Sequence, residues 1–214
     1  MIIESFVILA LIAAIFNTDL TGFGQFMICR PIFCAPIFGF LTGNIVEGLW
    51  MGMIVELLWI NAVPLGSYLP PDICAISILA TVWVNKFFPG LESASCTALL
   101  LAIPFGYACR NIDYFGRKIN VKIMYWIEDG ISKEQYKRIN IGIGLGLVLF
   151  IVKFFIFYLA AIPLGGFIFD LVYLNIPNFA VTGFKRAWFL FPILGFGSTL
   201  YAFWQFRKQR WMGR

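Results

Sequence analysis

The stretch Gln25–Asp72, QFMICRPIFCAPIFGFLTGNIVEGLWMGMIVELLWINAVPLGSYLPPD, decides how the rest of the chain is interpreted. Its apolar segments are short, glycine and proline interrupt them, and ionisable residues stand between them. An ionisable side chain at membrane depth costs about 2.5–3.5 kcal/mol or more, so it usually faces a cavity, a partner or a transport pathway. We therefore expect Arg30, Glu47, Glu56 and Asp72 to face protein or water rather than lipid.

The whole chain has the composition of an integral membrane protein. Of its 214 residues, 61% are hydrophobic and 13% are charged, whereas soluble domains have roughly 45–50% and about 25%. Since a spanning helix takes about 20 apolar residues, the length allows about six to eight membrane elements. Residues 2–20 have no basic leader and no small-residue cleavage site, so we interpret them as a retained first helix rather than a secretory signal.

The positive charge is concentrated in two hydrophilic segments. Seven of the sixteen Lys and Arg residues lie between Arg110 and Arg138, and four lie in residues 207–214. Basic residues in short loops and tails mark the cytoplasmic side of a membrane protein, and we prefer this interpretation to nucleic-acid binding. The prediction is a cytoplasmic loop at 111–139 and a basic cytoplasmic tail at 207–214, with a weak attraction to anionic membrane lipid.

The chain contains no histidine and five scattered cysteines. Without histidine, a histidine general base, a histidine-ligated metal and a phosphohistidine are all excluded within this chain. The cysteines lie in apolar sequence without a CxxC pair, which is typical of buried reduced thiols. We therefore expect no metal, no cofactor and no catalytic residue. An intramembrane enzyme would have to rely on Glu56, Asp72 or a thiolate, and no supporting group of residues is visible.

The first membrane half, residues 1–110, is expected to consist of short or broken helices. Gly48 and Gly52 have the spacing that lets two membrane helices approach closely. Residues 61–72 contain several helix breakers, so they form either irregular backbone beside a cavity or an aqueous loop between two helices. Both possibilities stay open. The helices expected in this half span residues 32–46, 48–60, 73–88 and 93–109.

The second membrane half, residues 140–206, is expected to repeat the pattern of a long span followed by a broken one. Together, the two halves predict an all-α, polytopic membrane protein of spanning helices and re-entrant or broken hairpins, in two pseudo-repeated halves. Broken helices in corresponding places favour a transporter. The predicted elements are a short cytoplasmic helix within 132–138, a span at 140–162, a break at 161–166, a segment too short to cross at 167–175, a loop at 175–183 and a span at 187–206.

Glu56 and Asp72 are the residues that we expect to bind a polar substrate. Carboxylates accept charge-assisted hydrogen bonds from hydroxyl groups, and Asn61 and Ser67 lie nearby in the sequence. The alternative is an internal ion pair between Arg30 and one of the glutamates. The other membrane charges are interpreted as structural: Arg30, Glu47, Lys153 and Asp170.

The glycine, proline and charge spacing forms a pattern that covers nearly the whole chain. It is dense between residues 25 and 72 and thinner between residues 141 and 206. The pattern resembles the membrane C component (IIC) of mannose/fructose/sorbose-type sugar phosphotransferase systems. It is carried by Arg30-Pro31, Gly39, Gly43, Gly48, Gly52, Glu56-Leu57, Gly66, Pro71-Asp72, Ile176-Pro177, Gly183-Phe184, Pro192 and Gly195.

The resemblance implies a sugar permease subunit in the bacterial plasma (inner) membrane. A IIC protein of this type forms an oligomeric complex with a IID membrane protein and moves a hexose inward. Cytoplasmic IIA and IIB proteins then phosphorylate the sugar by way of histidines, which agrees with the absence of histidine here. The resemblance also implies that Gly66 belongs to the sugar site. Because full-length members continue for about two more spans, we expect a shortened member that diverges at its C-terminus.

Lys133, Lys137 and Arg138 are the residues that we expect to dock a IIB-like partner. They lie in the predicted cytoplasmic loop, where a basic surface is accessible from the cytoplasm. The alternative function is a non-transporting membrane anchor or sensor that recruits cytoplasmic phosphotransferase proteins through this loop. In that case, the carboxylate of Glu56 would be dispensable.

Overall fold

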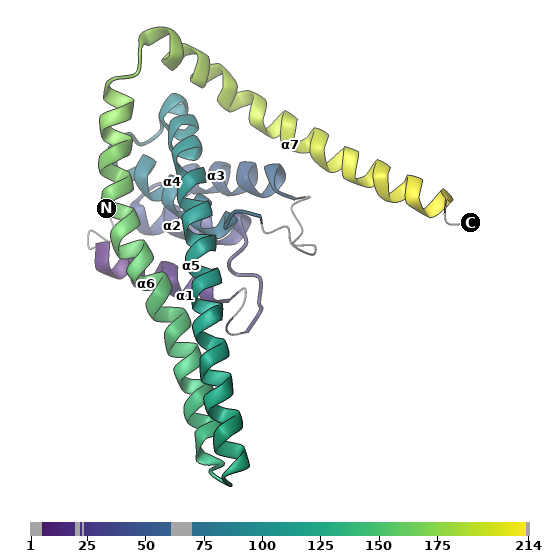
Figure 1. Ribbon diagram of the computed structural model, residues 1–214. Helices are drawn as coiled ribbons and strands as arrows, with labels where there is room; N and C mark the ends of the chain where they lie inside the picture. The colour runs from purple at the N-terminus through teal and green to yellow at the C-terminus, as the bar shows by residue number, and fades with distance from the viewer. Residues whose placement is uncertain (1–5, 20–21, 23, 61–69, 213–214) are drawn as a thin grey trace.

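The computed structural model describes residues 6–19, 22, 24–60 and 70–212, and these residues form seven α-helices and no strand (Figure 1). The all-α fold class expected from the composition is therefore confirmed. The helices are α1 (Phe6–Thr18), α2 (Pro31–Thr42), α3 (Ile45–Leu58), α4 (Ile73–Phe87), α5 (Glu92–Ser132), α6 (Lys137–Leu174) and α7 (Asn178–Met212).

The four N-terminal helices are too short to cross a bilayer. They have 13, 12, 14 and 15 residues, whereas a spanning helix needs about 20. Within the described part of the chain, three helices are long and apolar enough to cross: Glu92–Ser132, Lys137–Leu174 and Asn178–Trp204. The expectation of short, broken elements in the first half is confirmed.

Helices α2 and α3 form a hairpin whose backbones approach closely. Pro31 stands in the first turn of α2, where its missing N–H breaks no helical hydrogen bond. Gly43 ends α2 with a φ of 98°, which favours glycine. A Cβ atom at Gly48 would lie 2.3 Å from the carbonyl oxygen of Ala35, and one at Gly52 would lie 2.4 Å from that of Pro31. The close packing predicted from the glycine spacing is confirmed.

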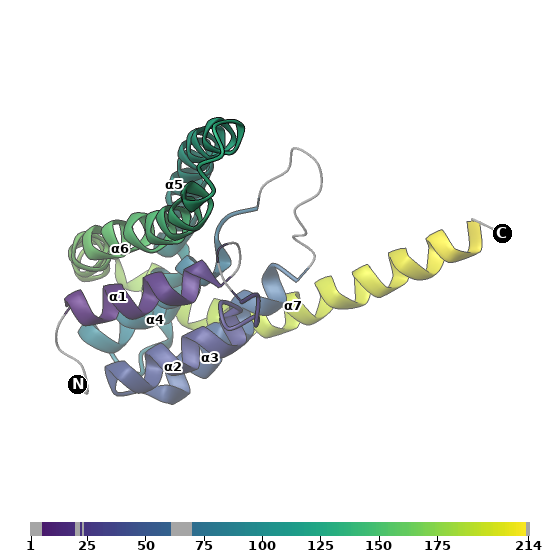
Figure 2. The ribbon, with the colours of Figure 1, turned by 90° about the horizontal axis from the view of Figure 1, so that it is seen from below.

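Helix α4 forms the centre of the fold. Twelve of its fifteen residues are buried, and it packs against α1, α2, α3, α5 and α6. Figure 2 shows α4 between the α5–α6 pair and the α2–α3 hairpin. Trp83 of α4 is the largest of the fully buried side chains. Protein therefore surrounds α4, and most of its buried side chains are apolar.

Helix α6 runs without interruption from Lys137 to Leu174. The predictions of a break at 161–166 and of a separate short segment at 167–175 are therefore wrong. Pro163 removes one backbone donor but leaves the helix intact. The indole N–H of Trp83 donates to the carbonyl oxygen of Ile162 at 3.1 Å. Gly165 and Gly166 lie against the rings of Trp83 and Phe87. These glycines therefore make room for aromatic side chains of α4 instead of ending the helix.

The expected loop at 111–139 is also replaced by helix. Helix α5 continues to Ser132 and α6 begins at Lys137, so only residues 133–136 connect them. The short helix predicted within 132–138 is absent, because the Ser132 hydroxyl donates to the carbonyl oxygen of Asp129 at 2.8 Å instead of capping a new helix. We call residues 110–132 of α5 and 137–153 of α6 the arm, which extends beyond the short helices (Figure 1).

Helix α7 begins at Asn178, so the predicted loop at 175–183 is wrong beyond Pro177, and Lys185-Arg186 lie inside the helix. The carbonyl oxygen of Pro177 accepts the N–H groups of Ala180 and Val181 and so starts the first turn. Helix α7 crosses over the body and extends away from it (Figure 1). It contacts the end of α3, where the Ser198 hydroxyl donates to the carbonyl oxygen of Leu57 at 3.0 Å.

Candidate functional site

An ion pair joins the two helices of the α2–α3 hairpin at its open end. Arg30 Nη1 lies 3.1 Å from Glu56 Oε1. The Arg30 side chain is 44% exposed and the Glu56 side chain is 16% exposed. The second carboxylate oxygen of Glu56, Oε2, is buried and accepts no hydrogen bond from the described residues. The internal pair considered as an alternative in the sequence therefore exists, and it leaves one acceptor of Glu56 available.

Asp72 begins α4 and caps it. Its Oδ1 accepts the N–H of Ala75 at 3.0 Å, and its own N–H donates to the carbonyl oxygen of Gly106 at 3.1 Å. Its Oδ2 accepts the thiol S–H of Cys109 at 3.4 Å. A side-chain oxygen at this position satisfies one of the free N–H groups of the helix. Asp72 therefore has a structural role, and hydroxyl binding by Asp72 stays a prediction.

The Arg30–Glu56 pair and the N-terminus of α4 lie at the same end of the hairpin. The thiols of Cys34, one turn after Arg30, and Cys74, two residues after Asp72, are 3.9 Å apart. The chain between Glu56 and Asp72 contains three predicted site residues that lie outside the described residues: Asn61, Gly66 and Ser67. The structure thus brings Arg30 and Glu56 together and places Asp72 at the start of the neighbouring helix.

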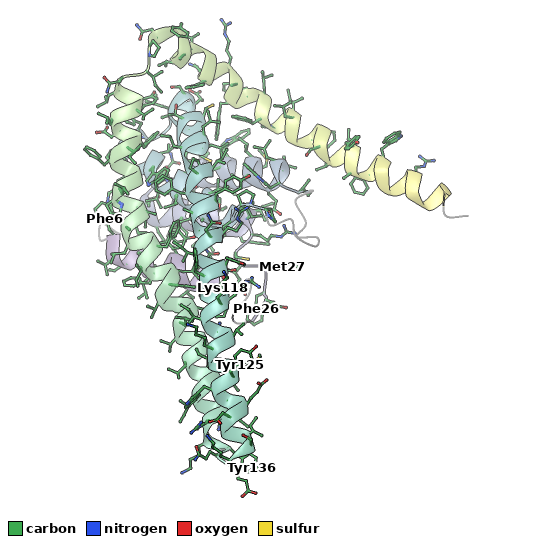
Figure 3. All side chains as sticks on the ribbon, in the orientation of Figure 1. Phe6, Phe26, Met27, Lys118, Tyr125 and Tyr136 are labelled. Atoms are coloured by element: carbon green, nitrogen blue, oxygen red, sulfur yellow. The ribbon has the colours of Figure 1, made fainter. Side chains whose placement is uncertain are left out.

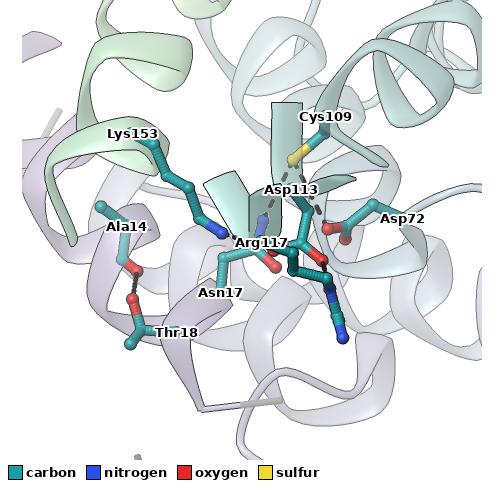
Figure 4. Close-up of polar contacts among 8 residues, drawn as sticks. All are labelled: Ala14, Asn17, Thr18, Asp72, Cys109, Asp113, Arg117 and Lys153. Carbon is teal, nitrogen blue, oxygen red and sulfur yellow. Dashed lines mark hydrogen bonds and ion pairs between the residues drawn. The ribbon is translucent and has the colours of Figure 1, made fainter. Parts of the chain in front are cut away.

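A buried polar cluster next to Asp72 was not predicted from the sequence. The amide Nδ2 of Asn17 donates to the Cys109 sulfur at 3.3 Å (Figure 4). It also donates to the Tyr158 hydroxyl at 3.1 Å. Asn17 Oδ1 is buried and has no partner among the described residues. In the sequence, Asn17 was only part of the expected first helix at 2–20, and Cys109 was one of five cysteines expected to be buried thiols. Their role depends on contacts across 92 and 141 residues, which no local pattern could show.

Lys153, in the most apolar part of the chain, is neutralised by a distant carboxylate. Its ammonium group pairs with Asp113 on α5, which also pairs with Arg117 at 2.8 Å (Figure 4). The ammonium also lies 3.8 Å from the centroid of the Phe150 ring. Gly116 leaves room for the lysine stem, since a Cβ there would lie 2.7 Å from Lys153 Cδ. The structural role expected of Lys153 from the sequence fits this pair, although Asp113 was not expected as its partner.

Glu47 lies at the opposite end of the hairpin from Glu56 and is held by structural contacts. Its N–H donates to the Asn44 side chain at 3.2 Å, and its carboxylate accepts the hydroxyl of Ser95. The amide of Asn85 donates to Thr42 Oγ1 at 2.7 Å nearby. Gly39 faces Gly48 across the hairpin, so its lack of a side chain serves packing. Pro71, immediately before the α4 cap, is buried.

The residues predicted to dock a partner lie at the tip of the arm, where they make contacts of their own. Lys133 Nζ lies 2.8 Å from one Asp129 oxygen, and Arg138 Nη1 lies 3.2 Å from the other. The Arg138 guanidinium also lies 5.1 Å from the centroid of the Trp126 ring. Lys137 is exposed in the first turn of α6. Docking by these residues stays a prediction.

Sequence relatives are found among proteins of sugar phosphotransferase systems. The sequence model of the family described as the PTS system sorbose-specific IIC component (EII-Sor) matches residues 3–212. A sorbose-specific EIIC component of Klebsiella pneumoniae is 22% identical over 137 residues, which are 62% of this chain and 50% of that protein. A protein assigned as N-acetylgalactosamine permease IIC component 2 of Escherichia coli (strain K12) is 28% identical over 100 residues, 47% of this chain and 71% of that protein. The match thus spans half the length of the first relative.

Two solved structures share the fold. A structure described as that of a membrane protein has a TM-score of 0.75 at 18% identity, covering 95% of this chain and 81% of that chain. The mannose transporter ManYZ, solved in complex with microcin E492, has a TM-score of 0.68 at 20% identity, with the same two coverages. At these identities the similarity shows the fold alone.

Proposed function

Because the chain belongs to the sorbose-specific IIC family of phosphotransferase systems, we propose that it is a permease subunit that moves a hexose inward together with a IID-like membrane partner. The sugars in the names of its relatives support a sugar substrate. Phosphoryl transfer is assigned to separate IIA- and IIB-like proteins of the cytoplasm, since this chain has no histidine to carry a phosphoryl group. The proposed complex is an oligomer in the bacterial plasma membrane, with the arm tip and the C-terminus in the cytoplasm.

The observation that carries this proposal is the half-satisfied carboxylate of Glu56 beside Arg30. Glu56 Oε2 accepts no hydrogen bond from the described residues, and Arg30 is partly exposed. A sugar hydroxyl both donates and accepts, so it can donate to the carboxylate while its oxygen accepts from the guanidinium. The ion pair orients both groups before the sugar binds.

Asp72 is the second proposed contact. One of its oxygens is committed to the α4 cap, while the other accepts from the thiol of Cys109. A thiol is a weak donor, so a sugar hydroxyl can replace it without loss of the cap. Asn61, Gly66 and Ser67 lie in the segment that joins the helix of Glu56 to Asp72, and we include them in the proposed site.

Sugar binding and uptake, measured with the IID-like partner present, test this assignment. Glu56→Gln and Asp72→Asn keep size and shape but remove the charged acceptor. A charge-assisted hydrogen bond contributes about 1.5–3 kcal/mol, so each variant should lose about ten- to hundredfold in sugar affinity. The matched control is Glu47→Gln, which changes a buried glutamate at the other end of α3 and should leave sugar affinity unchanged. Wild-type affinity in both site variants would refute the site.

The extension of the arm beyond the body favours a second candidate, recruitment of phosphotransferase proteins without transport. Charge reversal of Lys133, Lys137 and Arg138 should then abolish binding of the IIB-like protein, while Glu56→Gln has no effect on any activity. Sugar uptake that depends on Glu56 would exclude a purely recruiting role. Uptake that is unchanged after charge reversal at the tip would exclude docking through these residues.

A further inference from the structure

The two helices of the arm present outer surfaces of different character. Gly116, Asn120 and Ile127 of α5 face α6. Residues three or four apart share a helix face, so Lys118, Lys122 and Tyr125 lie on the opposite, outward face of α5, where Figure 3 labels Lys118 and Tyr125. All three are exposed. The outward positions of α6 are instead apolar and are also exposed: Ile141, Gly144, Leu145, Val148 and Val152.

The apolar length of α6 exceeds what a transmembrane orientation can place in lipid. Between Arg138 and its end at Leu174, α6 carries only two charged residues, Lys153 and Asp170. Its 38 residues extend about 57 Å at ~1.5 Å per residue. Even at a tilt of about 40°, the upper end of the usual range, it still rises about 44 Å, whereas the hydrocarbon core is about 30 Å thick. The arm part of α6 therefore extends beyond the hydrocarbon core, and its apolar side chains need a second apolar environment outside it.

An apolar groove on the flank of the arm continues this surface onto α5. It has a volume of about 260 Å³ and opens between the two helices. Gly142 and Gly146 of α6 lie along it and keep the helices close without filling it. Its walls are mostly apolar side chains, with the amide of Asn120 at one end: Ile123, Met124 and Ile127 of α5 and Ile143, Leu147 and Phe150 of α6. A groove of this size and character accommodates a flexible hydrocarbon chain better than a folded element.

The outward face of α5 carries pairs of cations and aromatic rings. The Lys118 ammonium lies 4.5 Å from the centroid of the Tyr114 ring and 5.8 Å from that of Phe115. Seven basic and four acidic residues lie between Arg110 and Arg138, so the arm also has a net positive charge. Aromatic and basic side chains on one face, with an apolar face behind them, are typical of helices at the interface between lipid and water. A protein cover over α6 would leave this second face unexplained.

We propose that the arm runs obliquely through the headgroup region of one leaflet, in line with the membrane-crossing part of α6, as an amphipathic two-helix element. Its α6 side and the groove face the acyl chains, and the Lys118–Lys122–Tyr125 face of α5 lies at the anionic headgroups. The partner is the lipid of the surrounding leaflet, and an acyl chain occupies the groove. This arrangement is independent of sugar transport, and it leaves the tip of the arm at the aqueous boundary.

Spin labels on single introduced cysteines test the arrangement in the full chain reconstituted in bilayers that contain phosphatidylglycerol. Labels at Ile141→Cys and Val148→Cys report on α6, and labels at Lys122→Cys and Tyr125→Cys report on α5 at a similar level of the arm. Collision with oxygen, which partitions into acyl chains, is compared with collision with a water-soluble nickel chelate. The five native cysteines are buried, so the labelled wild type supplies the background. Leu164→Cys in mid-helix α6 and Tyr136→Cys at the tip are the lipid and water references; both side chains are exposed.

We expect an oxygen-to-nickel collision ratio severalfold higher at both α6 positions than at both α5 positions. The ratios at Ile141 and Val148 should match the ratio at Leu164. Nickel access at all four positions would show an arm projecting into water and overturn the proposal. Protection from both reagents on α6 would show a protein cover and overturn it equally. Lipid-like ratios on both helices would show a buried arm, which also contradicts it.

Discussion

The indole N–H of Trp83 donates to the carbonyl oxygen of Ile162 at 3.1 Å, and the ring lies against Gly165 on the next turn of α6. This contact joins α4, which is almost entirely buried, to α6, the most apolar of the three long helices. Ring and glycine fit without space between them, because a Cβ at Gly165 would lie 2.0 Å from Trp83 Cζ2. The junction therefore fixes where α6 crosses the core.

Gly165→Ala should destabilise the protein. The added methyl group overlaps a ring that is 1% exposed and cannot move aside, and overpacking of this kind costs about 1–3 kcal/mol. Thermal unfolding in detergent, followed by circular dichroism, measures the loss. Gly144→Ala on the same helix is the control, because no atom lies within 4 Å of the new Cβ. Equal melting temperatures for both variants would contradict the tight junction.

Asp113→Asn should destabilise the start of the arm, because it leaves the ammonium of Lys153 without its carboxylate. The Lys153 side chain is 9% exposed, and removal of one partner of a buried pair costs about 3 kcal/mol or more. Replacing both partners, Asp113→Leu with Lys153→Met, should recover most of the stability. Chemical unfolding in detergent measures the free energy of unfolding of the single and the double variant. The control Asp129→Asn breaks only exposed pairs at the tip and should leave the stability almost unchanged.

Substitutions of Asp72 should separate its structural role from its proposed binding role. Asn caps a helix about as well as Asp, whereas Ala costs about 1 kcal/mol. We therefore expect Asp72→Asn to keep the melting temperature and lose sugar affinity, and Asp72→Ala to lower both. The measurement is thermal unfolding beside sugar binding for each variant. Wild-type sugar binding by a folded Asp72→Asn protein would leave Asp72 as a cap only.

Gly48→Ala should separate the two helices of the α2–α3 hairpin. The new Cβ would lie 2.3 Å from the carbonyl oxygen of Ala35, and backbone cannot rotate away as a side chain can. A shift of α3 would also move Glu56 relative to Arg30, so we expect lower stability, by about 1–3 kcal/mol, and weaker sugar binding together. Gly183→Ala, where the space around the Cβ is open, is the control. A stable Gly48→Ala protein with normal binding would contradict the role of the close approach.

Local chemistry in the sequence was sufficient for several elements of the first half. The helices expected at 32–46, 48–60 and 73–88 correspond to α2, α3 and α4, but Gly43 and Asn44 form the turn between α2 and α3 and lie inside the first of these ranges. Proline geometry, positive φ at glycine and side-chain capping act within a few residues, so a linear pattern records them. In α6, glycine and proline wrongly predicted a helix break, because Gly165 and Gly166 make room for the rings of Trp83 and Phe87 of α4 instead.

Site chemistry was only partly visible in the sequence. An internal ion pair between Arg30 and one of the glutamates was expected as an alternative to substrate binding, and in the structure Arg30 pairs with Glu56. The partner of Lys153 and the Asn17–Cys109–Tyr158 cluster were missed, because each joins helices that are far apart in the chain. Side chains that look alike in the sequence, such as Glu47 and Glu56, differ only in what surrounds them.

By itself, the sequence determined that this is an all-α membrane protein of the IIC type, because hydropathy and the spacing of glycine, proline and charge are properties of the linear chain. Only the tertiary structure decided which charges are paired, whether α6 breaks and whether residues 110–140 form a loop or an arm. Those outcomes depend on the atoms that other helices place against a residue. Trp83 against Gly165 and Asp113 beside Lys153 are such neighbours, and they lie 82 and 40 residues away along the chain.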